Sequence, residues 1–231
     1  LRSQQQILLM KKEIGFEYVR IYNLFKQDMY EEMEDGTENY NKIHNEVKII
    51  IKNYLGKIKF LFLAVNWERK GGAIAYETIK ILHDKGYDVE LQIIGCNPNI
   101  QESFVKIIPF LNKNNSDDLA QIQQHLLNSH FLFVPTRADC TPIAFCEAAG
   151  YGLPVISTDT GGVSATVEHQ KTGLLLPIQA TANDFAEAIQ FFLDTPEEIE
   201  ILSKNSITKY KKELNWDYWG EQMKNIFTNL E

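Results

Sequence analysis

The sequence has few cysteines and no apolar run long enough to cross a membrane. Its three cysteines, Cys96, Cys140 and Cys146, are odd in number and match no zinc-ligand spacing. We therefore expect free thiols in a reducing compartment, the cytoplasm. No uninterrupted apolar stretch approaches the roughly 18–20 residues that a membrane-spanning helix needs, and the first residues lack the apolar segment of a signal peptide.

Basic residues are scarce as well, because the chain carries 23 Lys and Arg against 31 Asp and Glu, a net charge of -8. Nucleic-acid sites need clustered Lys and Arg, so this balance argues against a nucleic-acid partner but still allows a local phosphate site. The five histidines show no metal-ligand spacing, and the sequence has no Asp-x-Asp motif like that of metal-dependent sugar transferases. We expect neither a metal nor another cofactor.

The chain does contain enough apolar residues for one full core, since 44% of its 231 residues are hydrophobic. Residues 1–57 differ from the rest, because an acidic run at 31–36 ends in glycine and several asparagines follow it. We interpret this run as a polar connection between two helical pieces, the second over about 40–54. The pattern becomes regular afterwards, which predicts a separate domain over 58–231.

Apolar strands alternate with helices after residue 57. The expected strands are 58–65, 88–95, 104–108, 131–134 and 153–156, with a sixth over 173–176. The expected helices are 72–83, 117–128, 142–149, 183–193, 196–211 and 216–230. This order predicts an α/β fold whose parallel sheet is covered by helices on both faces. We expect Ser116 to cap the second helix, and Trp216 and Trp219 to pin the last helix onto the sheet.

Distinctive polar residues follow four of the expected strands. They lie in the segments 66–70, 95–99, 137–141 and 158–162. The carboxyl ends of parallel strands share one edge of a sheet, where loops enter helix amino termini and ligands bind. The four loops therefore predict one ligand site on that edge.

Two acids, Asp139 and Glu147, flank the start of the short helix expected over 142–149. We expect Thr141 to cap this helix and Pro142 to take its first position. Glu147 is the only polar side chain from 143 to 149, so it is either a buried carboxylate that needs a specific partner or a surface residue facing water. A carboxylate pair for hydrolysis is less consistent with one acid on a loop and the other on a helix than a pair that grips hydroxyls.

The loop after the first strand, Trp-Glu-Arg-Lys-Gly-Gly over 67–72, places two cations beside two glycines. Arg69 can fork to phosphate oxygens while Lys70 acts as a point charge, and glycine lets backbone amides approach an anion. The hexapeptide is neither a Walker loop nor a dinucleotide fingerprint. Its simplest alternative is an exposed Arg and Lys beside a turn.

Together these segments resemble retaining GT-B glycosyltransferases of glycosyltransferase family 4 (group 1). Asp139-x7-Glu147 is similar to the Glu-x7-Glu motif of that family, and the likeness extends to the segments 67–72, 152–162 and 171–177. The resemblance covers about residues 58 to 231. It implies the carboxyl-terminal, Rossmann-like domain of such an enzyme, which binds a nucleotide-diphosphate sugar and transfers the glycosyl group with retention, without a metal.

The resemblance also implies roles for particular residues. Glu147 would hydrogen-bond the ribose, Asp139 would hold hydroxyls of the transferred sugar, and Lys70 with Arg69 would neutralise the diphosphate. Further donor contacts are implied at Gly71, Gly95, Thr141, Pro142 and Ile143, and at Phe110 and Leu111, whose backbone would meet the base. The acceptor, an unknown glycan or small molecule, would be held by an amino-terminal GT-B domain. Residues 1–57 are too short for that domain and would be its tail or a linker, so we expect the isolated chain to be inactive.

Several positions depart from the family pattern. The first acid is Asp139 rather than Glu, Pro142 stands where Gly is common, Val65 replaces an Arg, and Ala165 replaces an acid. These changes keep open a non-catalytic module that binds a nucleotide or a glycan. A GT-B sugar-nucleotide epimerase or a phosphorylase is a further alternative, because the cations at 69–70 do not distinguish these reactions.

Overall fold

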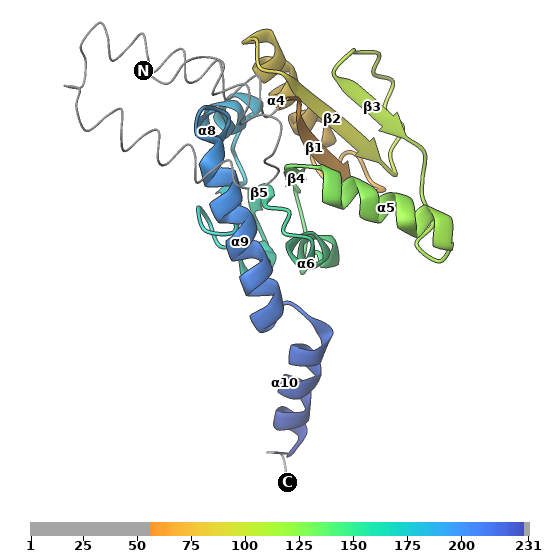
Figure 1. The fold of residues 1–231 in the computed structure, drawn as a ribbon, viewed down its shortest axis with the longest axis vertical. Coiled ribbons are helices and arrows are strands. Elements are labelled where there is room, and N and C mark those ends of the chain that lie inside the picture. The colour runs from red at the N-terminus through yellow and green to blue at the C-terminus, as the bar shows by residue number, and fades with distance from the viewer. Residues whose placement is uncertain (1–55, 229–231) are drawn as a thin grey trace, which may run out of the picture. The chain divides into compact units, whose positions relative to one another are not determined.

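The domain is a six-stranded, all-parallel β-sheet flanked by helices, as the computed structural model describes it over residues 56–228 (Figure 1). The strands are β1 (Ile58–Leu63), β2 (Val89–Ile94), β3 (Val105–Ile108), β4 (Phe131–Phe133), β5 (Val155–Asp159) and β6 (Gly173–Pro177). The helices are α4 (Gly72–Asp84), α5 (Ser116–Asn128), α6 (Ile143–Gly150), α7 (Val163–Thr166), α8 (Ala182–Asp194), α9 (Pro196–Glu213) and α10 (Trp216–Thr228). The predicted α/β architecture is confirmed, including the sixth strand.

Two predictions lie outside the described residues: the polar connection at 31–36 with its helix over 40–54, and the separate status of residues 1–57. One described element, α7, was not predicted. A single helical turn of four residues is too short to show a 3.6-residue apolar period.

The strand order is β3-β2-β1-β4-β5-β6, so β1 lies in the middle and pairs with β2 on one side and β4 on the other. The winding of the chain reverses between β1 and β4. At such a reversal the loops after the two neighbouring strands turn to opposite faces and leave a crevice at the carboxyl ends. This topology therefore places the loops after β1 and β4 at the edge of the sheet predicted to bind a ligand.

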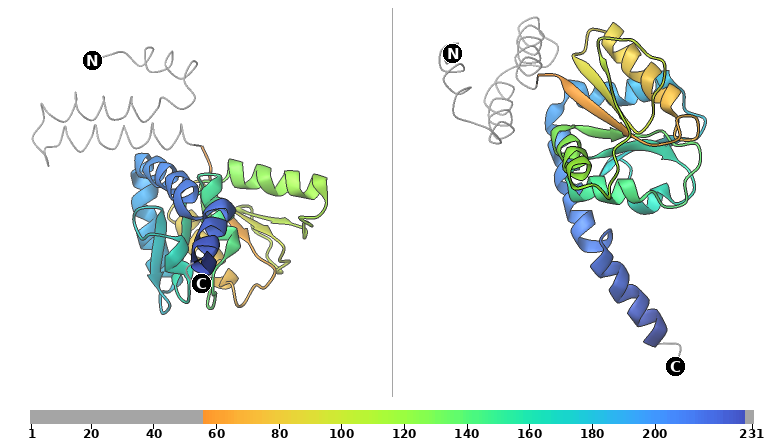
Figure 2. Two further views of the ribbon diagram at one scale, coloured as in Figure 1. Left: turned by 90° about the horizontal axis from the view of Figure 1, so that it is seen from below. Right: turned by 90° about the vertical axis from the view of Figure 1, so that its right-hand side faces the viewer.

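The core consists of apolar side chains from both faces of the sheet. Helices cover the two faces, with α4 packed against α8 and α6 against α9 (Figure 2). At the centre Phe60 of β1 stacks on Phe131 of β4 with ring centroids 5.5 Å apart, and both side chains are fully buried. Burial on both faces explains why these strands read as continuous apolar runs rather than alternating ones.

Helix starts follow local capping chemistry. Asn115 caps α5, because its Oδ1 accepts hydrogen bonds from the backbone amides of Asp117 and Asp118 at 3.0 Å each. The predicted cap, Ser116, is instead the first residue of this helix. Thr181 and Asp184 form a reciprocal capping box at the start of α8.

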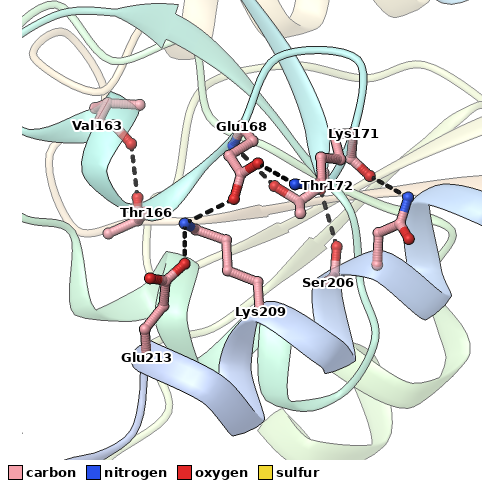
Figure 3. Close-up of polar contacts among 9 residues, drawn as sticks. Val163, Thr166, Glu168, Lys171, Thr172, Ser206, Lys209 and Glu213 are labelled. Atoms are coloured by element: carbon pink, nitrogen blue, oxygen red, sulfur yellow. Dashed lines mark hydrogen bonds and ion pairs between the residues drawn. The ribbon is translucent and has the colours of Figure 1, made fainter. Parts of the chain in front are cut away.

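A buried lysine ties α9 to the segment between α7 and β6 (Figure 3). Lys209 Nζ lies 2.6 Å from Glu213 Oε1 and 3.0 Å from Glu168 Oε1, and only 10% of its side chain is exposed. Burial acts to lower the pKa of Lys209, but the hydrogen bonds to the two carboxylates outweigh it and raise the pKa. Ser206 also donates from α9 to the carbonyl of Thr172 at 2.9 Å. These contacts fix the chain between the fifth and sixth strands.

The last helix does not pack as predicted. Trp216 and Trp219 are 68% and 56% exposed, and they contact each other edge to face with centroids 5.9 Å apart. None of the α10 residues is buried, and the helix continues beyond α9, away from the sheet (Figure 1). The prediction that these tryptophans pin the helix to the sheet is therefore wrong. Apolar spacing identifies a helix face but not the surface that covers it.

Within residues 56–228 no helix combines the length and the apolar character needed to cross a bilayer.

One histidine contributes a backbone contact at the start of the sheet. The amide of Lys59 donates a hydrogen bond to His130 Nδ1 at 3.0 Å, which requires the neutral ring with its proton on Nε2. Burial, together with the nearby charge of Lys59, lowers the pKa of His130. The folded state therefore disfavours the charged ring.

We expect the free energy of unfolding to decrease as the pH falls below about 6.5, the ordinary pKa of histidine in an unfolded chain. In that range the unfolded chain takes up a proton that folded His130 resists. His130→Asn retains an acceptor but does not titrate, so its urea-unfolding midpoint should change less between pH 7.5 and 5.5. His83→Asn, at an exposed histidine, should keep the wild-type pH dependence. If the urea midpoint changed by the same amount between these pH values in wild type and in His130→Asn, the assignment to His130 would be contradicted.

Candidate functional site

The reversal of strand order brings Lys70 and Asp139 together. Lys70 lies in the loop after β1 and Asp139 in the loop after β4, and Lys70 Nζ donates a hydrogen bond to Asp139 Oδ2. Their side chains are only 17% and 12% exposed. The structure thus unites, in one ion pair beside the reversal of strand order, two residues that the sequence singled out separately.

The Lys70 loop is held rigidly against the loop that carries Asp139. Asn66 accepts bonds from the amides of Arg69, through its side chain at 2.8 Å, and Lys70, through its carbonyl at 3.1 Å. The Arg69 carbonyl accepts from the amide of Arg137 at 2.7 Å. The guanidinium of Arg69 donates to the carbonyl of Ala138 at 2.9 Å, although the residue is otherwise exposed. Arg69 therefore links the two loops in addition to contributing positive charge.

The glycines in the loops after β1 and β2 are required by close packing, which the sequence did not reveal. Gly71 has a φ of 72°, and a Cβ there would lie 2.0 Å from the carbonyl oxygen of Pro135. A Cβ on Gly72 would lie 2.2 Å from the ring of Trp67. Gly95, with a φ of 90°, would place a Cβ 2.7 Å from the Ala64 carbonyl oxygen. Close packing of loops requires these glycines, and a donor contact at Gly71 or Gly95 stays a prediction.

The Gly-Gly turn after β5 packs directly against the backbone of the Asp139 loop. A Cβ on Gly161 would lie 1.9 Å from the carbonyl oxygen of Asp139, and one on Gly162 would lie 1.7 Å from that of Cys140. The Gly162 amide donates to the Asp139 carbonyl at 3.2 Å. Only glycine at both positions allows this backbone-to-backbone contact, which fixes where the backbone of Asp139 lies.

Glu147 lies on α6 and is partly exposed, with 35% of its side chain accessible. Lys113 Nζ lies 2.6 Å from Oε1 and 2.5 Å from Oε2 of this carboxylate. The structure thus falls between the two alternatives for Glu147, since the carboxylate is partly exposed yet has a specific partner. The sequence did not identify Lys113, because it lies 34 positions away in a polar loop without a motif.

The start of α6 differs from the prediction. Pro142 is the N-cap residue rather than the first helical residue, and no side chain caps the helix, so the cap expected from Thr141 is wrong. Pro142 has an extended ψ of 102°, and the helix therefore begins one residue later, at Ile143. Pro142 is buried, whereas Thr141 and Ile143 are exposed beside the Asp139 loop.

The loop between β3 and α5 carries the residues expected to meet a base. Phe110 is exposed, while Leu111 is half-buried and packs against the core. The same loop holds Lys113, so it reaches the Glu147 side of the crevice from the outer strand β3.

The cysteines near this edge are unpaired. All three cysteines are free thiols, and burial, followed by the charge of Glu147, raises the pKa of Cys146. The described part of the chain contains no cluster of three His, Cys, Asp or Glu side chains that could hold a metal ion.

Comparison with known proteins identifies the family. The family model described as "Glycosyl transferases group 1" matches residues 57–195, more than half of the chain, and the chain belongs to this family. The six-stranded parallel sheet is accordingly the Rossmann-like type of domain found in GT-B glycosyltransferases.

Two curated relatives cover most of the chain. D-rhamnosyltransferase WbpZ of Pseudomonas aeruginosa is 27% identical over 168 residues, which are 68% of this chain and 42% of the relative. Spore coat protein SA of Bacillus subtilis is 24% identical over 184 residues, 74% of this chain and 49% of the relative. The chain thus spans less than half the length of either protein.

Solved structures share the fold. Sucrose-phosphate synthase from Thermosynechococcus elongatus has a TM-score of 0.58 at 23% identity, over 75% of this chain and 45% of that one. HepE from Anabaena, in complex with UDP-glucose, has a TM-score of 0.61 at 14% identity, over 80% of this chain and 52% of that one.

We expect Gly162→Ala to displace the Asp139 loop and to lower the free energy of unfolding by about 1–3 kcal/mol, since the added methyl meets backbone that cannot rotate away. Gly220→Ala is the matched control, because a Cβ there has no atom within 4 Å and lies in helix α10. That change should raise stability slightly or leave it unchanged. Urea unfolding of the two variants measures both effects, and equal stabilities would contradict the role of the Gly-Gly turn.

Proposed function

We propose that this chain is the donor-binding domain of a retaining glycosyltransferase and that the crevice beside β1 and β4 binds a nucleotide-diphosphate sugar. The observation that carries the proposal is the pairing of Lys70 with Asp139 at the switch point of the sheet. A cation for the diphosphate and an acid for the sugar hydroxyls are then joined by one hydrogen bond. The family membership and the fold shared with HepE, which was solved with UDP-glucose, support this assignment.

The ion pair implies an exchange of partners when the donor binds. Lys70, assisted by the exposed Arg69, would turn from the carboxylate to the diphosphate oxygens. Asp139, released from the ammonium group, would accept hydrogen bonds from hydroxyls of the sugar. Both groups start from low solvent exposure, so little water has to be removed before the exchange.

The nucleoside would lie toward α6 and the loop after β3. Glu147 would accept bonds from the two ribose hydroxyls, and the backbone near Phe110 and Leu111 would meet the base. The exposed amino end of α6 at Thr141 and Ile143 would face the phosphates, where the helix dipole favours negative charge. Pro142 contributes no amide to this contact, since proline has no N–H.

The chemistry needs no metal and no protein base. The bond between the anomeric carbon and the diphosphate oxygen breaks as the acceptor hydroxyl attacks from the same face. The leaving diphosphate takes the proton of that hydroxyl, so the negative charge on the diphosphate is what the protein must stabilise. Lys70 and Arg69 supply that stabilisation in the crevice.

The departures at Val65, Ala165 and Asp139 bear on donor identity. Val65 is exposed at the end of β1, where it presents an apolar surface instead of a guanidinium. Asp139 is one methylene shorter than glutamate, so its carboxylate reaches less far toward a sugar. We therefore propose a donor sugar different from that of enzymes with the full motif.

We expect calorimetric titration with UDP, GDP and ADP to show binding of one of them. Glu147→Ala should weaken that binding about 10-fold or more, because a charged hydrogen-bond acceptor for the ribose is lost. Glu200→Ala is a matched control on a carboxylate that is paired to an exposed lysine on α9. Failure of all three nucleotides to bind, in a protein that folds normally, would refute the donor role.

We propose that the acceptor is held by an amino-terminal domain that residues 1–57 are too short to supply. The purified chain of 231 residues should then bind the nucleotide yet transfer no sugar to added acceptors. Release of nucleoside diphosphate from a bound nucleotide sugar is the measurement, with and without a separately supplied amino-terminal domain of a relative. Transfer by the chain alone would show that the acceptor site is within it. Binding that never leads to transfer would favour the non-catalytic module.

A further inference from the structure

We propose that Lys113 is a positioning residue for Glu147, holding its carboxylate in the orientation that receives the ribose. The inference rests on the proposed role of Glu147 and extends it to a residue outside the segments that carry the family resemblance. It starts from the two short contacts of Lys113 Nζ, 2.6 Å to Oε1 and 2.5 Å to Oε2.

The two contacts fix the carboxylate more tightly than one would. A glutamate on a helix surface has three rotatable side-chain bonds and loses rotamer entropy when it is held in place. Nζ bridges both oxygens, so both are held at hydrogen-bonding distance from one ammonium group. Each oxygen retains a lone pair that Lys113 does not use, and a ribose hydroxyl can donate to it.

The loop that carries Lys113 is itself held in place. The amide of Asn112 donates to Asp118 Oδ2 at 2.8 Å, and the amide of Asn114 donates to Asn112 Oδ1 at 3.0 Å. Asn115 then caps α5. Lys113 thus extends from a segment anchored on both sides to the start of a helix, which gives the ammonium group a defined origin.

Stability alone does not account for this pair. Lys113 and Glu147 are 47% and 35% exposed, and exposed ion pairs contribute about 0–1 kcal/mol. Glu147 also lies in the last turn of α6, where a negative charge opposes the helix dipole. A carboxylate in an unfavourable helix position that is nevertheless held at both oxygens is better explained by a ligand contact.

Charge gives a second reason for a lysine here. A bare carboxylate beside a diphosphate would repel it, whereas the paired carboxylate presents acceptors without net charge. Lys113 therefore lets the crevice use Glu147 for hydroxyls while it binds an anion with Lys70.

The test compares UDP, GDP and ADP each with its 2′,3′-dideoxy analogue, by calorimetry, and uses the pair whose parent nucleotide binds. The ratio of the two Kd values measures what the ribose hydroxyls contribute, and effects of charge on the diphosphate cancel in it. Lys113→Met should reduce that ratio about fivefold or more, and Lys113→Arg should restore most of it. Lys204→Met removes the same charge from an exposed pair with Glu200 on α9 and should leave the ratio unchanged.

The outcomes distinguish the positioning role of Lys113 from the nucleotide binding on which it depends. A reduced ratio in Lys113→Met, with the thermal midpoint of unfolding preserved, supports the positioning role. An unchanged ratio in Lys113→Met, in a chain whose wild-type ratio is well above one, overturns that role and leaves the proposed function intact. A wild-type ratio near one overturns the ribose role of Glu147, and absence of nucleotide binding overturns the proposed function itself.

Discussion

The site depends on one steric constraint: the loop after β4 lies directly on the Gly-Gly turn after β5. Two carbonyl groups, those of Asp139 and Cys140, occupy the space where side chains at 161 and 162 would begin. With these backbones in contact, Asp139 lies within hydrogen-bonding reach of Lys70, in the loop after the neighbouring strand β1. The parallel sheet provides the crevice, but this contact determines where the backbone of its acid lies.

A second principle of the site is compensation of charge. Lys70 pairs with Asp139 and Lys113 pairs with Glu147, although the four residues come from three loops and a helix. Without a ligand each acid therefore has a cationic partner at hydrogen-bonding distance. In a chain of net charge -8, such local pairing allows an anionic ligand to approach carboxylates that would otherwise repel it.

The fold could be predicted from the sequence because strands buried on both faces are continuous apolar runs. The pairing of Lys70 with Asp139 was only implicit, since it requires the order of strands, which follows from the reversal between β1 and β4. Lys113 could not be predicted, because a lysine in a polar loop has no local signal and its partner is brought near only by folding. Trp216 shows a different kind of error. The sequence predicted that this side chain packs on the sheet, but in the structure it is exposed.

The Lys70–Asp139 pair also has a consequence for the end of a reaction cycle. On the proposed function, both residues are occupied by the intact donor, one by its phosphates and the other by its sugar. Once the sugar has been transferred, Asp139 has lost its ligand and is again the nearest anion to Lys70. An internal carboxylate then competes with the spent nucleoside diphosphate for the same ammonium group. The ion pair of the empty crevice would thus act as a built-in competitor that promotes product release.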